Sequence, residues 1–595
     1  MSQGSEFVVG IDLGTTNSVV AYAPLSADEP VVSLLPIPQF VAPDTVEERT
    51  SLPSFLYLPT TGEGPFELPW GETSDGVCGE YARQKSAEVP DRTVGAAKSW
   101  LCHTRVDRHQ PILPWNADDE VPKVSPVEAS RRYLKHLIQA WEHAHPEAPL
   151  SAQRVVLTVP ASFDASAREL TREAAVQAGL PENFVLIEEP QAAVYSWLAQ
   201  MGEQWRKSLH VGDTLLVVDV GGGTTDLTLV SVTDEDGELA LKRVAVGNHL
   251  LVGGDNMDLA LAHYVAGLFA EKGTKLDPWQ SVSLWHSCRV AKETLLAEDG
   301  PAKHKISILG RGRKLIGGTV SVELERDKAR DILLQGFFPD SNLTDRPAKR
   351  RGSGFQELGL PYEADPGITK HIASFLAQHG ESEDQPVQPT DVMVNGGVFK
   401  STAVGEQLLK VLGSWFPDAP PKTLQGERDL DHAVARGAAY YGWSKVHGGV
   451  RIRGGTARSY YVGIESAGLA IPGIPRPLRA LCVVPRGMEE GTEADVLSDE
   501  IGLIVGEPAH FRFFSSSIRK DDQPGMQIDS WEEEEIVETD SLEATLPAEA
   551  GDEGHYMPVK FRSRITELGM FELWCVSTRT DQRWKLEFNV REDDE

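Results

Sequence analysis

Two short segments of the chain share one pattern of apolar and polar positions. In each, a run of apolar and β-branched residues leads into a glycine-rich polar loop, and another apolar run follows; the loops are residues 12–18 and 219–226. This pattern predicts a strand, a turn and a second strand, so each segment should form a β-hairpin. Glycine lets backbone N–H groups approach a phosphate, threonine hydroxyls add donors, and aspartates can hold a hydrated Mg²⁺. Two such hairpins predict two lobes that grip one nucleotide.

Strand-length apolar runs and helical periodicities alternate between and after the hairpins, which is typical of an α/β fold. One predicted helix begins at an N-cap on Asp164 or Ser166 and ends at Gly179. The other predicted strands are residues 154–160, 184–187, 239–246 and 391–394, and the other predicted helices are residues 128–145, 188–201, 253–270, 281–297, 323–337 and one that begins at Asp431.

The predicted helix over residues 281–297 has Val290, Leu295 and Leu296 at spacings that put them on one face. After the helix at 323–337 the pattern predicts a long loop that ends at Asp365. A glutamate pair, Glu188 and Glu189, stands where a buried strand runs into a helix. Either carboxylate is a candidate for positioning water or metal, although such a pair can also serve as a helix N-terminal charge.

The pattern changes near Gly448. Residues 459–595 contain few helical periodicities and many short alternating runs, from one at 460–464 through one at 510–514 to the last at 584–590. These runs predict strands of a separate β-rich, sandwich-like domain. Residues 448–458 are basic and rich in glycine, and we interpret them as a linker. Residues 1–447 would then form the two-lobed domain. The acidic stretch 532–553 is interpreted as a solvated or disordered loop.

Composition narrows the classes of partner. The chain has 595 residues and a formal net charge of −32, which predicts several domains and argues against nucleic acid or an anionic membrane surface as the main partner. The basic cluster 346–352 is interpreted as a solvated loop. The five cysteines are scattered without a Cys-x-x-Cys pair, and no apolar run reaches membrane-spanning length. We therefore expect reduced thiols and a cytoplasmic location.

Five segments, taken together, resemble the DnaK-type heat-shock chaperone family. They occur in the family's order, and the resemblance covers residues 7–445. It implies an actin-like, two-lobed ATPase that binds ATP and Mg²⁺ and gates a β-domain for unfolded or extended polypeptide. The segments are 11–18, 156–163, 187–193, 218–226 and 431–439.

The resemblance implies a role for each residue that matches a family motif. Lys98 would help to orient the attacking water, and Pro160 and Arg168 would relay the nucleotide state. The residues implied in catalysis are Lys98, Glu189, Asp219, Thr224 and Asp226, and those implied in Mg²⁺ binding are Asp12 and Asp219. The residues implied in ATP binding are Gly14, Thr15, Thr16, Asn17, Gly221, Gly222, Gly223, Thr225, Gly253, Gly254, Lys292, Gly396, Gly397 and Asp431.

The sequence also departs from the family's pattern. Arg289 stands where the family has glutamate, and Glu293 where it often has a basic residue, so base recognition is expected to be altered. Val185 replaces a basic residue used by J-domain partners, which leaves that partnership in doubt, while a nucleotide exchange factor stays open as a partner. The chain ends at Glu595 without the family's helical lid, so the expected chaperone is a lidless one.

Two other functions are compatible with the same fold. A metabolite kinase would need a catalytic aspartate that faces a sugar-like pocket. A filament or scaffold protein would leave the C-terminal β-domain without a role. The β-domain itself could bind polypeptide by pairing with an extended segment, or act as a docking or regulatory module on the ATPase.

Overall fold

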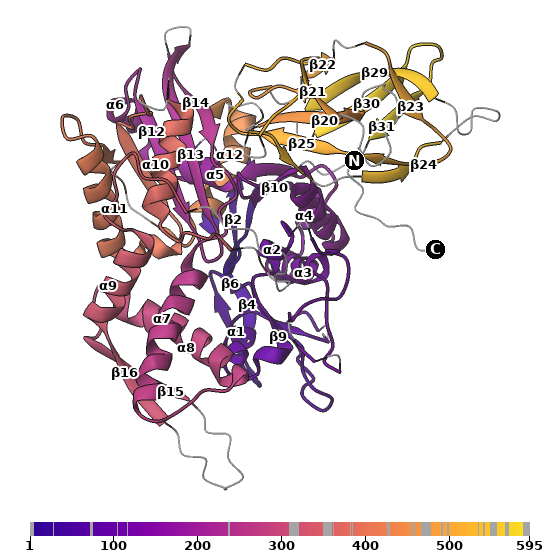
Figure 1. Cartoon of the computed structure of the whole chain (residues 1–595). Coiled ribbons are helices and arrows are strands. Elements are labelled where there is room, and N and C mark those ends of the chain that lie inside the picture. Colours follow the sequence, from indigo (N-terminus) through magenta and orange to yellow (C-terminus); the bar gives the residue numbers. More distant parts are fainter. Residues whose placement is uncertain are drawn as a thin grey trace, which may run out of the picture.

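The computed structural model describes residues 5–586 apart from gaps, the longest of which are 309–319, 349–359, 466–477, 548–555 and 566–570; the remaining gaps span one to three residues each. Two mixed six-stranded sheets form its larger part (Figure 1). The first contains β1 (Phe7–Leu13), β2 (Asn17–Pro24), β3 (Ser33–Leu34), β6 (Leu52–Pro53), β10 (Arg154–Val159) and β11 (Val185–Glu188). The second contains β12 (Thr214–Val220), β13 (Thr225–Glu235), β14 (Glu238–Val246), β17 (Asp391–Asn395), β18 (Lys422–Thr423) and β19 (Ile452–Arg453).

The two sheets have the same pairing at their centres. In the first, β1 pairs antiparallel with β2 and parallel with β10; in the second, β12 pairs antiparallel with β13 and parallel with β17. Each polar loop predicted from the sequence therefore lies at the tip of a hairpin, between β1 and β2 and between β12 and β13. Because the partner strand on the other side is parallel, its carboxyl end reaches the same edge of the sheet as that tip.

Helices cover both sheets. Helix α3 (Pro126–Ala144) precedes β10 of the first sheet, α4 (Ala165–Ala178) follows β10, and α5 (Glu189–Met201) follows β11. Helix α4 is capped as the sequence predicts, by the Asp164 side chain and a left-handed Gly179. The remaining helices are α1 (Glu80–Glu88), α2 (Ala97–Trp100), α6 (Trp205–Ser208), α7 (Gly254–Glu271), α8 (Pro278–Leu296), α9 (Arg326–Phe337), α10 (Ile368–His379), α11 (Thr402–Trp415) and α12 (Ala433–His447). Smaller elements are β4 (Ile37–Ala42), β5 (Thr45–Arg49), β7 (Leu56–Tyr57), β8 (Val77–Cys78), β9 (Thr93–Val94), β15 (Lys303–Ile308), β16 (Val320–Glu325) and the 3₁₀ turns Pro90–Arg92, Leu150–Ala152, Gly202–Gln204 and Gly397–Lys400.

Helices α5 and α12 join the two sheets through one shared core. Apolar side chains of β1 and β10 and of β12 and β13 meet the same two helices in this cluster. The helices approach closely because glycine lies at their contact: a Cβ on Gly437 would be 1.7 Å from the Ala192 carbonyl oxygen. A Cβ on Gly10 of β1 would likewise be 2.5 Å from the Ala435 carbonyl oxygen of α12. The glycines therefore fix how near the sheets come to each other.

The C-terminal region is built from strands. One sheet contains β20 (Ser459–Glu465), β21 (Leu478–Val484), β25 (Phe513–Ser516), β26 (Gln527–Ile528) and β27 (Val537–Glu538), and the other β22 (Glu493–Asp495), β23 (Ile501–Ile504), β29 (Tyr556–Ile565), β30 (Phe571–Ser577) and β31 (Arg583–Leu586). A separate ribbon pairs β24 (Pro508–Phe511) with β28 (Leu542–Thr545). Apolar residues of both larger sheets share one core. None of the described helices is long and apolar enough to cross a membrane.

The segment predicted to be a linker contains a strand of the second sheet. Ile452 pairs in parallel with Leu241 of β14, and its backbone N–H donates to the Tyr195 hydroxyl at 2.8 Å. The side chain of Ile452 is buried in the core that α5 and α12 share. This part of the chain is thus packed on the second sheet and on helices α5 and α12.

Several expectations about local structure are wrong in part. Val290 is 54% exposed, on the opposite side of α8 from the buried Leu295, because α8 contacts its neighbours through other positions. Residues 323–325 end β16 instead of beginning α9, and the predicted strand 510–514 is divided at Arg512. The sequence reading missed α1, α10, α11 and the β15–β16 hairpin.

The acidic stretch is not simply a solvated loop. Ile536 within it is buried, and Val537–Glu538 and Leu542–Thr545 pair as strands, so tertiary packing overrides the charge pattern there. The rest of the prediction falls partly on residues 548–553, outside the described ones. Residues 349–352 of the basic cluster and 587–590 of the last predicted strand also lie outside them.

The contact between α5 and α12 can be tested by adding one methyl group. We expect Gly437→Ala to lower the free energy of unfolding by about 1–3 kcal/mol, because the new Cβ meets backbone that cannot move aside cheaply. The matched control is Gly405→Ala in α11, where a Cβ meets open space, and which should be neutral or stabilising by about 0.5–1 kcal/mol. Urea unfolding of both variants measures the difference; equal midpoints would contradict the steric account.

Candidate functional site

The tips of the two hairpins touch each other. A Cβ on Gly222 would lie 2.0 Å from the Thr16 hydroxyl oxygen, and one on Gly223 would lie 3.1 Å from Thr15 Cγ2. Beside this contact is a cavity of about 540 Å³, lined by both tips, by α7 and α8, by the turn after β17 and by the start of α12. Segments more than 400 residues apart in sequence therefore meet around one space.

Four carboxylates from the two sheets converge on this cavity. Asp12 ends β1, Asp219 ends β12, Asp226 opens β13 and Glu189 opens α5. Burial and the nearby Glu189 raise the pKa of Asp12 to about 7 and that of Asp219 to about 8. Burial also raises the pKa values of Glu189 and Asp226. Like charges this close oppose ionisation, so the cluster favours a bound cation.

Neighbouring side chains hold two of these carboxylates in place. The Thr158 hydroxyl of β10 donates to Asp12 Oδ1 at 3.0 Å, and the Asn395 amide of β17 donates to Asp219 Oδ2 at 2.8 Å. Both donors come from the strand that pairs in parallel with the one that carries the aspartate. The sequence reading missed Thr158 and Asn395 in this role, because only strand pairing shows which residues are neighbours.

Lys98 is the cation that faces the cluster. It is only 5% exposed and forms an ion pair with Glu189. Burial opposes its charge, but Glu189 and Asp12 outweigh burial and raise the pKa of Lys98. Its helix α2 begins after Ala96, a residue with a left-handed φ of 54°. That conformation is unfavourable for a residue with a side chain, so surrounding packing must hold it.

The two adjacent glutamates have different surroundings. Glu189 faces the cavity, whereas Glu188 binds Arg168 at 2.9 Å and also pairs with Arg243. Burial raises the pKa of Glu188, but the two guanidinium groups outweigh it and hold that pKa below its usual range. Glu188 is therefore ionised and forms ion pairs with two arginines, so of the two glutamates only Glu189 can act in the cavity.

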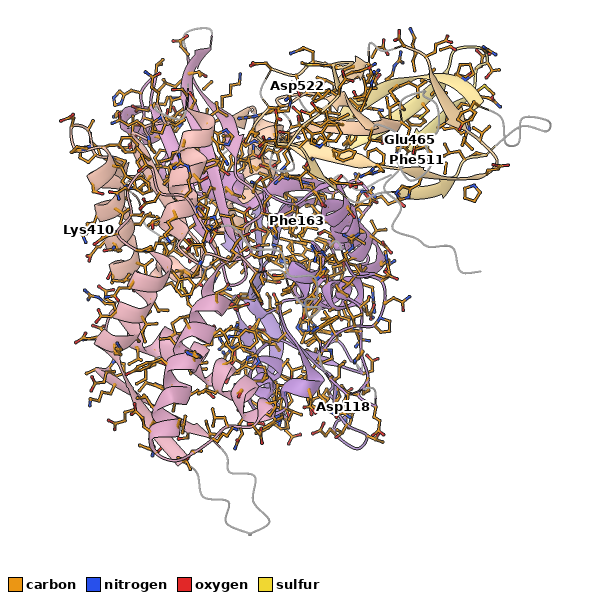
Figure 2. All side chains as sticks on the ribbon, viewed as in Figure 1. Asp118, Phe163, Lys410, Glu465, Phe511 and Asp522 are labelled. Atoms are coloured by element: carbon orange, nitrogen blue, oxygen red, sulfur yellow. The ribbon has the colours of Figure 1, made fainter. Side chains whose placement is uncertain are left out.

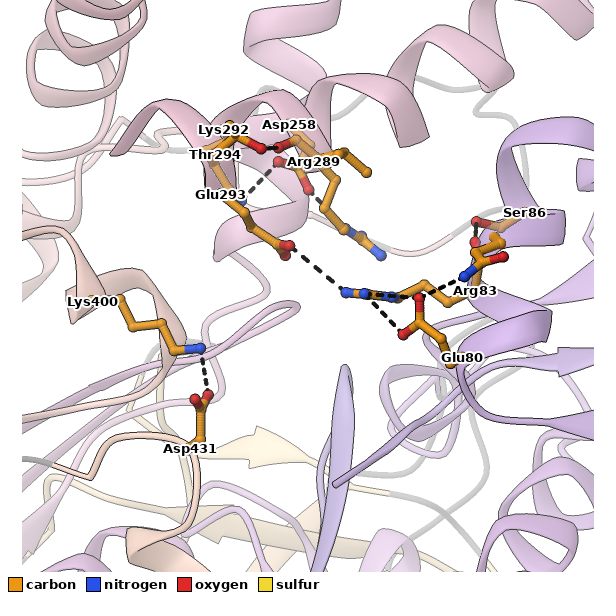
Figure 3. Close-up of polar contacts among 12 residues, drawn as sticks. Glu80, Arg83, Ser86, Asp258, Arg289, Lys292, Glu293, Thr294, Lys400 and Asp431 are labelled. Carbon is orange, nitrogen blue, oxygen red and sulfur yellow. Dashed lines mark hydrogen bonds and ion pairs between the residues drawn. The ribbon is translucent and has the colours of Figure 1, made fainter. Parts of the chain in front are cut away.

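A second cluster of charges supports the glycine turn at the start of α7. Arg289 of α8 pairs with Asp255 and, at 3.0 Å, with Asp258, while Lys292 donates to the Gly254 carbonyl at 2.9 Å (Figure 3). The arginine that departs from the family's pattern is thus the counter-charge of two buried aspartates. The altered residue supports the start of α7, where the backbone N–H groups of Gly254 and Asp255 donate to carbonyls of the loop at 221–222 at 3.0 Å and 2.7 Å.

The far end of the cavity carries charges that the family's pattern does not have. Glu293 of α8 pairs with Arg83 of α1 at 3.7 Å, across the opening, and Lys400 pairs with Asp431 at 2.6 Å (Figure 3). Gly396 has φ of 90°, and a Cβ there would lie 2.3 Å from the Val220 carbonyl oxygen. Glycine is therefore required at this turn, where the sequence predicts the adenosine.

The structure brings most of the predicted residues to the cavity but not all. The prediction that Thr225 binds ATP is wrong. Thr225 is fully buried, and its hydroxyl donates to the Val252 carbonyl at 2.7 Å, so its side chain turns away from the site. Ser99 was not predicted; its hydroxyl is buried beside Gly223 and has no partner among the described residues. Predicted residues that line the cavity are Asp12, Gly14, Thr15, Thr16, Asn17, Glu189, Asp219, Gly221, Gly222, Thr224, Asp226, Gly254, Lys292, Gly396, Gly397 and Asp431. Those packed against it are Lys98, Gly223 and Gly253.

These features fit a nucleotide phosphate chain with Mg²⁺. Gly222, Gly253 and Gly396 let the turns pack closely around the cavity, because a Cβ at each would collide with a neighbouring loop, and the buried Ser99 hydroxyl has no partner among the described residues. Within the described part of the chain, no three histidine, cysteine, aspartate or glutamate side chains are arranged to hold a metal directly. Mg²⁺ commonly keeps several waters and takes one or two carboxylates plus phosphate oxygens. Asp12 and Asp219 suit that mode.

Comparison with known proteins agrees with this geometry. Residues 70–335 match the family described as Hsp70 protein. The chain is 32% identical over 307 residues to a chaperone protein HscA homolog of Pseudomonas aeruginosa (49% of this chain, 42% of the relative). It is 30% identical over 269 residues to chaperone protein HscA of Photorhabdus laumondii (43% and 37%), and 27% identical over 279 residues to chaperone protein DnaK of Buchnera aphidicola (44% and 38%).

The family match and the relatives are all of one kind, so the class of protein that this chain resembles is the Hsp70 type, whose domain has an actin-like ATPase fold. The similarity lies in residues 70–335 for the family match, and the identity to the HscA and DnaK chaperones is low. The alignments span about two fifths of each relative's own length.

The glycine at the second turn provides a test of the phosphate site. We expect Gly253→Ala to weaken Mg-ATP binding about tenfold or more, since its Cβ would lie 2.7 Å and 2.8 Å from backbone oxygens of the neighbouring loop and displace it. Gly267→Ala, further along the same helix α7 and away from the cavity, is the matched control, because a Cβ there meets no atom within 4 Å. Titration calorimetry measures both; equal affinities would show that phosphate does not bind against this loop.

Proposed function

We propose that this protein is a Mg-ATP-dependent ATPase of the chaperone type, in which hydrolysis between two lobes controls polypeptide binding by the C-terminal β-domain. The observation that carries the proposal is the convergence of four buried carboxylates and Lys98 on a cavity lined by glycine-rich turns of both sheets. Phosphoryl transfer needs positioning and charge stabilisation more than covalent chemistry, and these groups supply both.

Each group has a place in the proposed reaction. Thr15 and Thr224 donate to the β- and γ-phosphates from the two hairpin tips, and backbone N–H groups of the same turns bind the remaining oxygens. Lys98 is directed to the γ-phosphate and stabilises charge there. Glu189 and Asp226 orient the attacking water. Asp12 and Asp219 would hold Mg²⁺ through water, and the ion, when bound, neutralises phosphate charge.

The far end of the cavity supports ATP with altered base recognition. The carboxylate of Glu293 and the Lys400–Asp431 ion pair stand where adenosine would lie. A carboxylate presents only acceptors there, so the base would be held by different contacts from those of the family. The Arg83–Glu293 pair across the opening adds a contact that must break when the two sides separate.

A metabolite kinase is the less favoured alternative. A larger cavity, about 1070 Å³, adjoins the first hairpin at Thr15 and Thr16, where an acceptor would have to bind. Its most buried carboxylate, Asp255, is ion-paired with Arg289 and so is not available as a base. Aromatic side chains also line this cavity, and they are Phe55, Trp100, Trp115, Trp279, Trp285 and Tyr362.

A β-domain that only docks on the ATPase is the other alternative, and one observation favours it. The C-terminal half contacts the second sheet at several points: Arg486 donates to the Val244 carbonyl, and the Ser517 hydroxyl lies 3.1 Å from Asn248 Oδ1. In a chaperone these contacts would form in one nucleotide state and break in another. In a regulatory module they would persist in both.

Substitution of the cluster tests the chemistry. We expect Lys98→Ala and Asp226→Asn each to reduce single-turnover ATP hydrolysis at least about a hundredfold, while Mg-ATP stays bound, because each removes a group that acts on the transferring phosphate or the attacking water. Lys410→Ala, an exposed lysine paired with Asp340, is the control. Wild-type rates in either cluster variant would overturn the assigned roles.

Adding an unfolded polypeptide tests whether the C-terminal β-domain belongs to a chaperone or is only a docking module. We expect an unfolded polypeptide to accelerate single-turnover hydrolysis of ATP several-fold in the full chain, since polypeptide binding by the β-domain and hydrolysis are coupled in the proposed function and the polypeptide would shift the ATPase toward its more active state. The measurement compares rates with and without the polypeptide, and with EDTA to remove Mg²⁺. Hydrolysis that requires Mg²⁺ but ignores polypeptide would leave the ATPase and remove the chaperone assignment.

A further inference from the structure

Ser162 links the catalytic cluster to a histidine that the proposed reaction does not use. It lies in the loop between β10 and α4, and its backbone N–H donates to Asp226 Oδ1 at 3.3 Å. Burial raises the pKa of Asp226, and hydrogen bonds from the hydroxyl and the backbone of Ser162 lower it. Ser162 therefore both orients this carboxylate and favours its ionised form.

His249 lies directly behind Ser162. Its Nδ1 is 2.6 Å from the Ser162 hydroxyl oxygen. A hydroxyl has one proton, so if Ser162 donates it to Asp226, the histidine must donate through Nδ1–H. Burial lowers the pKa of His249 to about 4, so the ring is neutral near pH 7 and its Nε2 carries the lone pair. That Nε2 is buried and has no partner among the described residues.

The other side of this histidine meets the C-terminal β-domain. Its chain neighbour Asn248 contacts Ser517 through side-chain oxygens 3.1 Å apart, and Arg486 fixes Ser517 by donating to its carbonyl at 3.1 Å. The positive charge of Arg458, which leads into β20, is close enough to contribute to the lowered pKa of His249. The segment 248–249 is thus held by the β-domain on one side and by Ser162 on the other.

An aromatic ring completes the connection. The ring centroid of Phe163 lies 5.9 Å from that of His249. On the catalytic side, Lys98 Nζ lies 6.0 Å from the centroid of the Phe163 ring. Figure 2 labels Phe163 within the densely packed side chains between the first sheet and the C-terminal strands. A shift of His249 would therefore be felt both by Asp226, through Ser162, and by Lys98, through Phe163.

We propose that His249 is a positioning residue, which donates a hydrogen bond to Ser162 and thereby sets the orientation of Asp226 according to whether the β-domain is docked on Asn248. The inference rests on the proposed ATPase function and adds to it the residues through which docking acts on the water-orienting carboxylate. Undocking removes the support of segment 248–249, and the donor chain His249, Ser162, Asp226 loses its first member.

Amide substitutions test the donor chain because they mimic one ring nitrogen each. Asparagine places its amide near the Nδ1 position and glutamine near the Nε2 position. We expect His249→Asn to keep single-turnover hydrolysis within about threefold of wild type, and His249→Gln to lower it about tenfold, the effect of losing one hydrogen bond to a carboxylate system. KM for Mg-ATP should change little in both. Equal loss in the two variants would contradict a directed hydrogen bond.

Ser162→Ala shows whether the two residues act as one unit. It should be as slow as His249→Gln, and the double variant should be no slower than either single one, because the second change removes a bond that is already broken. Additive losses would mean independent structural roles. Asn248→Ala, which loses the contact with Ser517, should slow hydrolysis about twofold to threefold in the full chain; an unchanged rate would remove the dependence on docking.

A matched histidine controls for the loss of a buried ring. His136 is also a buried histidine. Its Nε2 forms a hydrogen bond with the Pro38 carbonyl at 2.9 Å, and burial lowers its pKa to about 4. Because this bond involves Nε2, His136→Asn is the variant that loses it, and it should lower stability without changing the rate per folded molecule. If it slows hydrolysis as much as His249→Gln does, the effect is general destabilisation and the proposal fails.

The histidine tautomer gives a readout that does not depend on turnover. In ¹⁵N-histidine spectra of the full chain, His249 should be protonated at Nδ1, and Ser162→Ala should shift it toward the Nε2–H form. Protonation at Nε2 in the wild type would overturn the donor chain. If the wild type hydrolyses no ATP, the proposed function fails. The spectra would still decide whether His249 donates a hydrogen bond to Ser162.

Discussion

The buried carboxylate cluster is the constraint on which this structure depends. Asp12, Asp219 and Asp226 from the two sheets and Glu189 from α5 face one cavity beside Lys98, and burial together with the neighbouring carboxylates raises the pKa values of these four acids. Such a cluster costs stability, because like charges are held together away from water. The cost is offset when cations and phosphate-bound metal enter, so binding and the folded arrangement are linked.

The cluster can form only because the two sheets are held at a fixed distance. Helices α5 and α12 pack between them, and at Gly437 and Gly10 the contacts involve backbone atoms, with no side chain to yield. A rigid centre of this kind confines relative motion to the outer segments. There the contacts are polar and partly exposed, as with Arg83 and Glu293, and such pairs break at little cost.

The C-terminal strands contact the second sheet at another interface. Ile452 adds a short strand to this sheet, Arg486 donates to the Val244 carbonyl within β14, and Ser517 contacts Asn248 just after β14. Burial and the nearby Arg243, which pairs with Glu188, lower the pKa of Arg486. The ion pairs of Glu188 and the contacts of the β-domain therefore share one region of the molecule.

The sequence by itself determined the local elements and the chemistry of the turns. The two hairpins, the cap of α4 at Asp164 and Gly179, and most strands follow from residue pattern, because these depend on neighbours in the chain. Tertiary structure alone decided the partners: that Thr158 and Asn395 hold the aspartates, that Arg289 braces a turn, that Thr225 faces inward, and that Ile452 is a strand. Strand register and helix packing bring residues together over hundreds of positions, and no local pattern encodes that choice.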